Sequence, residues 1–220
     1  MRVALFGGTF DPIHLGHLRV AAAAADAFSL DRVLFAPVGR QPLKSDAPAA
    51  AFNDRLAMVA LALSQTRIED GRSLPPDPRF ALSSLDAPRP DGAPNYTVGT
   101  LAALALEYPT AQLFMIAGAD SFLTLRNWRS PAELLALAQW IVVSRPDFPL
   151  TSGFLDRPEF DLTPTQRARV HLLPGVHEDI SATALRTLLH AAATHPSNPS
   201  LDRWLPPAVA AYIREHHLYQ

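Results

Sequence analysis

The sequence contains no cysteine among its 220 residues. Disulfide bonds and thiolate-ligated metal sites are therefore excluded, and this composition fits a reducing compartment. A strong charge of either sign is also lacking, because 19 Lys and Arg nearly balance 21 Asp and Glu, for a formal net charge of −2. Without a run of Lys or Arg, the composition argues against an extended nucleic-acid-binding surface, and we expect no nucleic-acid partner.

Long apolar runs are absent as well. No apolar segment of the sequence reaches the roughly 20 residues that a membrane-spanning helix requires. The first expected strand begins at residue 2 or 3. This position leaves no room ahead of the strand for the charged and apolar regions of a signal peptide. We therefore expect a soluble, cytoplasmic protein with no membrane partner.

Length and composition predict a single globular domain. A chain of 220 residues fits one domain, and 48% of its residues are hydrophobic, which is enough to fill a core. We expect one domain over residues 1–220, with a small C-terminal helical part over about residues 180–220. The oligomeric state stays open, and a homo-oligomer is compatible with the sequence.

The most informative segment is the first seventeen residues, MRVALFGGTFDPIHLGH. Residues 3–6 form a short apolar run that stops at Gly7 and Gly8, which is typical of a buried strand followed by a turn. Glycine lets the backbone approach a ligand closely, and a helical pattern begins near Leu15. Open α/β sheets bind nucleotide phosphates at such a junction, against the N-terminus of the following helix.

Two histidines, His14 and His17, stand at the start of this expected helix, so both rings can face one anion. Two common phosphate motifs do not match here. The spacing is not G-x-G-x-x-G, and no Gly-Lys-Ser/Thr of a P-loop follows. The alternative is a glycine turn with two incidental surface histidines, but the glycine pair and both histidines together favour a phosphate site.

The rest of the hydrophobic pattern predicts strands that alternate with helices. Further strands are expected at residues 32–37, 80–85, 112–117, 140–144 and 170–173, with helices at 15–28, 53–65, 95–108, 134–138 and 207–217. This alternation favours a parallel sheet with right-handed crossovers. Two segments rich in Pro and Gly, residues 66–79 and 86–94, are expected to be loops, the second a candidate mobile flap, and residues 148–169 are expected to be irregular.

A second candidate phosphate site lies at residues 181–186, Ser-Ala-Thr-Ala-Leu-Arg. Ser181 is suited to cap a helix, but Ala184 stands where a capping box needs Glu or Gln, so backbone donors would remain free. With the hydroxyl of Thr183 and the guanidinium of Arg186, these donors make a compact polyanion site. The same pattern alone is ordinary helix capping, and its pairing with the N-terminal turn favours phosphate binding.

Both motifs resemble those of the nucleotidylyltransferase superfamily, specifically its bacterial nicotinate-nucleotide adenylyltransferase family. The N-terminal segment resembles the signature GGTFDP-x-H-x-G-H, and residues 180–186 resemble the family's Ile-Ser-Ser-Thr-x-Ile-Arg phosphate-binding helix. This resemblance spans nearly the whole chain. It implies a doubly wound, Rossmann-like α/β fold with a mainly parallel sheet. It also implies adenylyl transfer from ATP to nicotinate mononucleotide, giving deamido-NAD and pyrophosphate in NAD biosynthesis.

The resemblance implies roles for individual residues. His17, His14 and Lys44 would be the catalytic residues, and Asp120, in a Gly-Ala-Asp match, would contact the ribose. The implied ATP-binding residues are Gly7, Gly8, Thr9, Phe10, His14, His17, Asp120, Ser181, Thr183 and Arg186. Mg²⁺ would arrive with ATP and keep several waters, so no all-protein metal site is expected.

A different set of residues is implied for the acceptor nucleotide: Thr9, Arg40, Lys44, Tyr96, Thr97 and Trp128. The family's Pro-Pro-His-Lys segment reads Gln-Pro-Leu-Lys here, so Leu43 replaces a histidine, and Gly99 replaces a family aspartate. Structural alternatives stay open for three of these residues. Lys44 also fits a solvated loop, and both aromatic residues also fit a core position.

Two other functions fit the same motifs. A transferase of the superfamily with another acceptor would use nicotinamide mononucleotide or pantetheine phosphate. A non-catalytic nucleotide-sensing module would keep the glycine turn but could lose His17, Lys44 or Arg186, and all three are present. Tyr96 and Trp128 favour a pyridine nucleotide, whereas the choice between its acid and its amide stays open.

Overall fold

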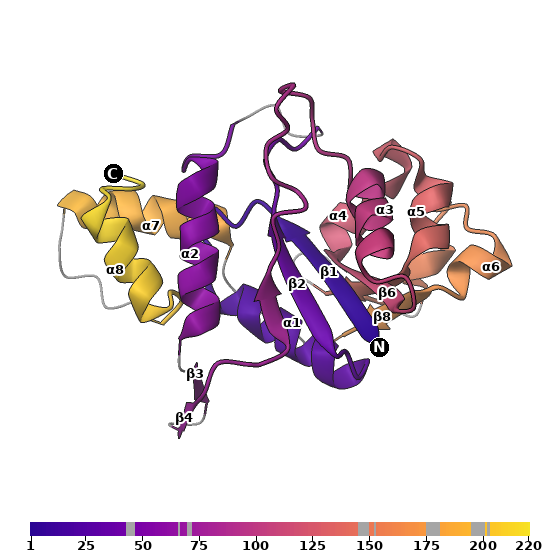
Figure 1. Ribbon diagram of the computed structural model, residues 1–220, viewed down its shortest axis with the longest axis horizontal. Coiled ribbons are helices and arrows are strands. Elements are labelled where there is room, and N and C mark those ends of the chain that lie inside the picture. Colours follow the sequence, from indigo (N-terminus) through magenta and orange to yellow (C-terminus); the bar gives the residue numbers. More distant parts are fainter. Residues whose placement is uncertain are drawn as a thin grey trace.

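A six-stranded parallel sheet forms the centre of the protein (Figure 1). The computed structural model describes residues 1–42, 47–65, 67–69, 72–144, 150–151, 153–174, 181–194, 201 and 203–220. The sheet order is β5-β2-β1-β6-β7-β8, and every neighbouring pair of strands is parallel. These strands are β1 (Arg2–Gly8), β2 (Arg32–Pro37), β5 (Phe80–Leu82), β6 (Gln112–Gly118), β7 (Gln139–Val143) and β8 (Val170–Leu173).

Helices cover both faces of this sheet. They are α1 (Leu15–Ala27), α2 (Phe52–Ser64), α3 (Thr97–Glu107), α4 (Ala119–Leu123), α5 (Pro131–Leu137), α6 (Pro164–Arg167), α7 (Ala182–Thr194) and α8 (Pro207–Glu215), with 3-10 turns η1 (Leu125–Asn127) and η2 (Phe154–Asp156). Residues of α1, α2, α7 and α8 share one buried cluster, and those of α3, α4 and α5 share another. In Figure 1, α2, α7 and α8 lie on the left and α3, α4 and α5 on the right.

The pleat of β1 explains the two clusters. Ala4 and Phe6 belong to the first cluster, whereas Val3 and Leu5 belong to the second. Successive side chains of a strand point to opposite faces, so a run of apolar residues is buried on both sides. Alanines at the buried positions of α1 remove bulk between this helix and the sheet. The opening motif therefore starts from a fully enclosed strand.

The strand order creates a switch point beside β1. The chain builds outward from β1 through β2 to β5, and then returns to the other side of β1 to build β6, β7 and β8. This is the order of a doubly wound Rossmann-like sheet, and the predicted fold class is confirmed. In such sheets, ligands bind at the carboxyl ends of the strands where the order reverses. Here that point lies between β1 and β6.

The six predicted strands are all present, but several boundaries and loops differ. β1 continues through Gly8, so the turn begins later than expected, and β5 ends at Leu82 rather than residue 85. The predicted loop at residues 66–79 contains the antiparallel pair β3 (Arg67–Glu69) and β4 (Arg72–Leu74). Strands of three residues are too short to give an alternating pattern in the sequence. η2 and α6 likewise fall inside the segment expected to be irregular.

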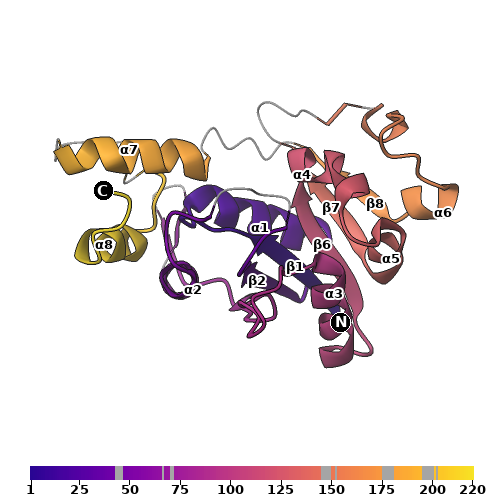
Figure 2. The same ribbon diagram turned by 90° about the horizontal axis from the view of Figure 1, so that it is seen from above.

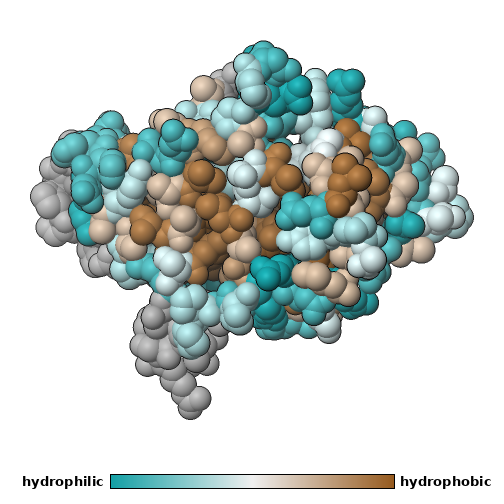
Figure 3. All heavy atoms as spheres, in the orientation of Figure 1, coloured by the Kyte–Doolittle hydropathy of each residue, from teal (hydrophilic) through white to brown (hydrophobic). Residues whose placement is uncertain are grey.

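The C-terminal helices extend the first core cluster. Leu185 of α7 and both Val209 and Ile213 of α8 are buried in the same cluster as α1 and α2. From above, α7 and α8 lie at the opposite end of the molecule from α5 and α6 (Figure 2). Hydrophobic residues gather over the middle of the face seen in Figure 3, between hydrophilic ends. Across the described residues, no helix is both long enough and apolar enough to span a bilayer.

Candidate active site

The turn after β1 is shaped by the ring of Phe10. That residue is buried and has a left-handed backbone φ of 48°. Its ring lies 5.6 Å from Phe6 and 5.9 Å from Phe35, measured between centroids. A Cβ added to Gly8 would lie 3.1 Å from this ring, so glycine at that position lets the ring fold back over the strand end. The packed ring supports a backbone conformation that a non-glycine residue rarely adopts.

His14 and His17 lie together at the start of α1. His14 is the N-cap residue, and its backbone N–H donates to Nδ1 of His17 over 3.2 Å. The ring centroids of the two histidines are 3.7 Å apart, and the His17 ring is 5.0 Å from that of Phe10. Because Nδ1 of His17 accepts a hydrogen bond, the proton of the neutral ring resides on Nε2. The capping contact therefore prepares His17 as a donor through Nε2.

The second predicted motif, residues 181–186, contacts the N-terminal turn through Arg186. Arg186 donates through Nη1 to the backbone carbonyl of Asp11 over 2.8 Å, although the two residues are 175 positions apart. Its Nη2 donates to Oγ1 of Thr183 over 3.2 Å, within the first turns of α7. The same Nη1 lies 3.9 Å from the Asp11 carboxylate. The structure thus brings the N-terminal turn and the start of α7 together, as the two motifs predict.

Ser181 caps α7 directly. Its Oγ accepts a hydrogen bond from the Ala184 amide over 3.1 Å, and its carbonyl accepts from the Leu185 amide over 2.9 Å. The expectation that early amides stay free for want of a capping box is therefore wrong for the Ala184 amide, because the serine hydroxyl alone satisfies it. A hydroxyl that accepts one hydrogen bond can still donate its own proton.

Arg55 is a buried charge beneath the site that the sequence analysis missed. It lies in α2 with 1% of its surface exposed. Its guanidinium donates to three backbone carbonyls, those of Thr9 at 2.7 Å, Val38 at 3.0 Å and Ala50 at 3.2 Å. Burial lowers the pKa of this guanidinium, while the charge of Asp11 acts in the opposite direction. Arg55 therefore fastens the turn after β1 to the loops after β2.

A sequence signal for Arg55 does exist. The buried residues of α2 are Arg55, Met58, Val59 and Ala62, which is the helical spacing of a core-facing stripe. A charged residue in the stripe of an otherwise apolar helix face is rarely buried without polar partners. Its position would have been enough to predict a buried structural role.

Asp11, like Arg55, connects the turn after β1 to other segments through hydrogen bonds. The residue is 3% exposed, and its carboxylate accepts hydrogen bonds from the amides of Ala49 at 2.7 Å and Ala50 at 3.1 Å. A third donor is the hydroxyl of Tyr219, at 2.7 Å, from the segment after α8. Burial and the adjacent carboxylate raise the pKa of Tyr219, so the phenol stays neutral and remains a donor. In the sequence, this aspartate stands out only as one letter of the N-terminal signature.

The loop after β2 is tied to the segment that follows β5. Gly39 donates through its amide to the carbonyl of Asp86 over 2.7 Å, and Arg40 donates through its amide to Oδ1 of Asn95 over 3.0 Å. The guanidinium of Arg40 donates to the carbonyl of Gly92 over 3.0 Å. A Cβ on Gly39 would lie 2.5 Å from the backbone nitrogen of Pro88, so only glycine permits this approach.

These contacts hold residues 86–94, the candidate mobile flap, in the conformation that the structure shows. Oδ1 of Asp86 also accepts a hydrogen bond from the hydroxyl of Thr100 in α3 over 2.6 Å, and both side chains are buried. Burial raises the pKa of the Asp86 carboxyl. The segment is therefore anchored at its base and along its length. Lys44, which the sequence analysis assigned to the acceptor site, and Leu43, which replaces the family's histidine, lie outside the described residues.

The predicted aromatic residues of the acceptor site lie on neighbouring segments. Tyr96 precedes the first residue of α3, Thr97, and its ring is covered by the guanidinium of Arg129, 4.7 Å from the ring centroid. The half-buried Trp128 donates through Nε1 to Oγ1 of Thr124 over 3.1 Å, and one edge packs on the buried Trp140. Arg129 is a further residue that the sequence analysis did not identify.

The remaining predicted residues also lie at the switch point. Asp120 is the second residue of α4 and follows β6 directly, while β6 pairs with β1 over Arg2–Leu5. The hydroxyl of Thr9 lies 3.4 Å from Oε1 of Gln41, which links the turn after β1 to the loop after β2. Among the described residues, no three acidic or histidine side chains are grouped as metal ligands.

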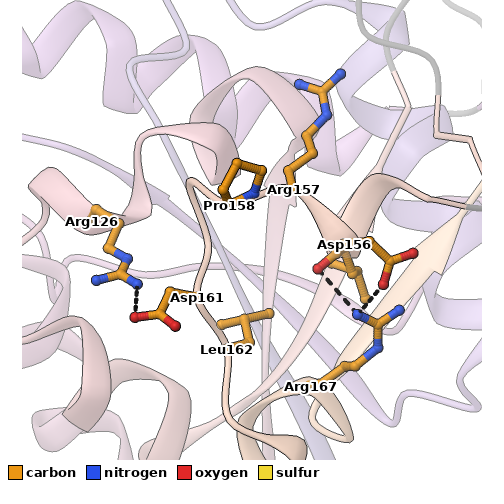
Figure 4. A pocket seen from close by; sticks show the side chains of 8 residues that line it. Arg126, Asp156, Arg157, Pro158, Asp161, Leu162 and Arg167 are labelled. Atoms are coloured by element: carbon orange, nitrogen blue, oxygen red, sulfur yellow. Dashed lines mark hydrogen bonds and ion pairs between the residues drawn. The ribbon is translucent and has the colours of Figure 1, made fainter.

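A separate polar cavity of about 520 Å³ lies near α6 and contains none of the predicted site residues (Figure 4). Its charged side chains are largely paired with one another. Arg126 forms an ion pair with Asp161 at 2.8 Å, and Arg167 forms one with Asp156 at 2.6 Å. This cavity is therefore distinct from the cluster of motifs at the ends of β1 and β6.

Comparison with known proteins matches this chain to one family. The family model described as cytidylyltransferase-like matches residues 5–188. A relative from Pelobacter propionicus, designated a probable nicotinate-nucleotide adenylyltransferase, is 38% identical over 231 residues, which cover 100% of this chain and 98% of the relative. A relative with the same designation from Thermus thermophilus is 37% identical over 220 residues, with both chains fully covered.

Solved structures share the fold. Nicotinic acid mononucleotide adenylyltransferase from Plasmodium falciparum, solved in complex with NaAD, aligns with a TM-score of 0.74 over 99% of this chain and 97% of its own, at 17% identity. A structure from Vibrio parahaemolyticus, named a putative nicotinate-nucleotide adenylyltransferase, aligns with a TM-score of 0.57 over 99% of this chain and 94% of its own, at 19% identity. By sequence and by fold, this chain belongs to the cytidylyltransferase-like family and, within it, to the nicotinate-nucleotide adenylyltransferases.

Proposed function

We propose that this protein transfers the adenylyl group of ATP to nicotinate mononucleotide, forming deamido-NAD and pyrophosphate in NAD biosynthesis. The observation that carries the proposal is the hydrogen bond of 2.8 Å from Arg186 to the Asp11 carbonyl. It joins two phosphate-binding motifs from opposite ends of the sequence. The full-length relatives with this designation support the same reaction.

The reaction requires no nucleophilic side chain. An oxygen of the acceptor's 5′-phosphate attacks the α-phosphorus of ATP, and the bond from that phosphorus to the β-phosphate bridging oxygen breaks. Pyrophosphate leaves with the electron pair. The acceptor phosphate is already an anion at neutral pH, so the protein contributes by positioning both substrates and by stabilising charge on the transferring group.

The ATP site is assigned to the turn after β1 and the start of α7. His17 donates from Nε2 to the α- and β-phosphates, since Nδ1 is engaged by the His14 amide at 3.2 Å. His14 assists in the same cluster. Arg186 and the hydroxyls of Ser181 and Thr183 hold the triphosphate tail. Donors that are fixed before the substrate arrives stabilise developing charge without reorganisation.

The turn and the strand end contribute backbone groups. Gly7, Gly8, Thr9 and Phe10 are assigned to ATP through backbone donors, in a conformation supported by the buried Phe10 ring. Asp120, at the carboxyl end of β6, is assigned to the ribose hydroxyls, for which a carboxylate is a suitable acceptor.

The acceptor site is assigned to the segments beside this turn. Thr9, Arg40 and Lys44 hold the acceptor phosphate, with the role of Lys44 resting on the family resemblance. Tyr96, Thr97 and Trp128 line the pyridine ring, for which flat aromatic faces are suitable partners. Arg129, held 4.7 Å over Tyr96, adds positive charge at this wall. A cation here favours the carboxylate of the acid over the neutral amide.

Nucleotidyltransferases of this family use ATP with a divalent metal, and Mg²⁺ is assigned here. Mg²⁺ keeps several waters and prefers phosphate oxygens, so it needs no protein cage. When bound, it neutralises charge on the phosphates. We assign the reaction to the cytoplasm, in keeping with the cysteine-free sequence.

The test is pyrophosphate release from ATP by the purified protein with a panel of acceptors. The panel contains nicotinate mononucleotide, nicotinamide mononucleotide and pantetheine phosphate. The proposal predicts release with nicotinate mononucleotide and slower release with its amide. Release with pantetheine phosphate alone would assign another transferase reaction. ATP binding without release for any acceptor would indicate a nucleotide-sensing module.

A further inference from the structure

A tyrosine from the segment after α8 reaches the nucleotide motif. The hydroxyl of Tyr219 donates to Oδ1 of Asp11 over 2.7 Å, across 208 positions of sequence. Asp11 is almost fully buried, and its carboxylate also accepts hydrogen bonds from the backbone amides of Ala49 and Ala50. Tyr219 is thus the side-chain donor among these three hydrogen bonds.

Arg186 lies at the edge of the same cluster. Its Nη1 donates to the Asp11 carbonyl at 2.8 Å but stays 3.9 Å from the Asp11 carboxylate. The longer distance exceeds that of a charge-assisted hydrogen bond, which is about 2.8 Å. The carboxylate is satisfied by other donors, so it does not draw the guanidinium into a close ion pair.

We propose that Tyr219 is a positioning residue of the ATP site, which satisfies the Asp11 carboxylate so that Arg186 keeps its charge for the nucleotide phosphates. This role rests on the proposed function, in which Arg186 binds the triphosphate. Loss of the Tyr219 hydroxyl leaves a buried carboxylate oxygen short of a donor. Arg186 is a charged donor 3.9 Å from Oδ2, the other oxygen of this carboxylate, and a closer pair with Asp11 withdraws that charge from ATP.

The charges around the carboxylate make a neutral donor important. Arg55 contributes positive charge near Asp11 from α2, and Arg186 does so from α7. A third cation would add positive charge to this cluster, whereas a neutral phenol donates a hydrogen bond without adding charge. Tyr219 keeps that proton because burial and Asp11 raise its pKa. The phenol therefore remains a hydrogen-bond donor at neutral pH.

The same region of the chain supplies a matched control. Tyr212 in α8 donates to Oδ1 of Asp54 in α2 over 2.9 Å, so it too joins the C-terminal region to a carboxylate. Asp54 is not part of the turn after β1. Replacing either tyrosine by phenylalanine removes one tyrosine–aspartate hydrogen bond and keeps the ring. Of these two tyrosines, only Tyr219 contacts Asp11, the residue whose carbonyl accepts a hydrogen bond from Arg186.

The experiment measures the Kd of a non-hydrolysable ATP analogue by calorimetry, together with KM and kcat, for the wild-type protein, Tyr219→Phe and Tyr212→Phe. We expect Tyr219→Phe to raise the Kd and the KM for ATP about tenfold, the scale of one charged hydrogen bond. The KM for nicotinate mononucleotide stays within about twofold. Tyr212→Phe leaves both ATP constants unchanged. Thermal unfolding of each variant verifies that it is folded at the assay temperature.

A double-mutant cycle with Arg186→Ala separates positioning from general loss of stability. Tyr219→Phe should have no further effect on ATP affinity in the Arg186→Ala background. The proposal would be overturned if Tyr219→Phe lowered ATP affinity equally in both backgrounds, or if both tyrosine variants lowered it equally. It would also be overturned if Tyr219→Phe did not lower ATP affinity at all. A Tyr219→Phe protein that fails to fold would also overturn it, because the hydroxyl is assigned to ATP binding. A wild-type protein that does not bind the analogue would instead refute the proposed function.

Discussion

Replacement of Arg55 tests how the site is held together. Arg55→Met keeps most of the aliphatic volume but removes three hydrogen bonds, to the carbonyls of Thr9, Val38 and Ala50. Each buried carbonyl left without a donor costs about 1 to 3 kcal/mol. Release of the desolvated guanidinium, whose pKa burial lowers, offsets part of that cost. We expect a net loss of about 3 kcal/mol in the free energy of unfolding.

Urea denaturation followed by circular dichroism measures this change directly. For a chain of this length, about 3 kcal/mol corresponds to a fall in Tm of about 9 °C. The matched control is Arg214→Met, which alters an exposed arginine of α8 and should shift stability by less than about 0.5 kcal/mol. A loss of less than about 1 kcal/mol for Arg55→Met would refute the assignment of Arg55 as the tie beneath the turn.

Three further predictions follow from the same geometry. His17→Ala should lower kcat by at least about 100-fold with the fold intact, which is the scale of losing one donor that stabilises charge. Steady-state kinetics measures this, and a near-normal kcat would contradict it. Arg129→Ala should lower kcat/KM for nicotinate mononucleotide about fivefold and leave kcat/KM for nicotinamide mononucleotide unchanged. An equal loss for both acceptors would show that Arg129 does not select the acid. Burial raises the pKa of the Asp86 carboxyl in the folded protein, so the neutral carboxyl contributes its full stability below the ordinary Asp pKa of about 3.9. This contribution is lost as the pH rises through the raised pKa of the folded protein. Asp86→Asn should therefore flatten the fall in unfolding free energy with pH above about 4, and an unchanged slope would count against a buried carboxyl there.

The sheet could be predicted because its strands are buried on both faces or follow a clear period. Residues 3–6, 112–117 and 140–144 are apolar runs bounded by turns, and each became a strand. The antiparallel pair of β3 and β4 could not be predicted from this signal, since its strands have three residues each. Periodicity needs several residues to appear, so it reports long elements and misses short ones.

The site was predicted only in part. The glycine turn, both histidines and the start of α7 carry local motifs, and the structure brings them together through Arg186 and Asp11. Tyr219 carries no motif that points to Asp11, because its partner lies 208 positions away and is reached only through the packing of α8. Arg129 is similar, since its contact with Tyr96 joins the segment after η1 to the residue before α3. Contacts between distant segments are a property of the fold rather than of local sequence.

The reaction proposed for this protein is adenylyl transfer to nicotinate mononucleotide. The most direct measurement follows the α-phosphate of ATP, radiolabelled at that position and incubated with the purified protein, Mg²⁺ and nicotinate mononucleotide. We expect the label to appear in deamido-NAD, the released pyrophosphate to be unlabelled, and neither product to form without the acceptor. Label that stays in ATP, or that appears only in AMP, would contradict the proposed reaction.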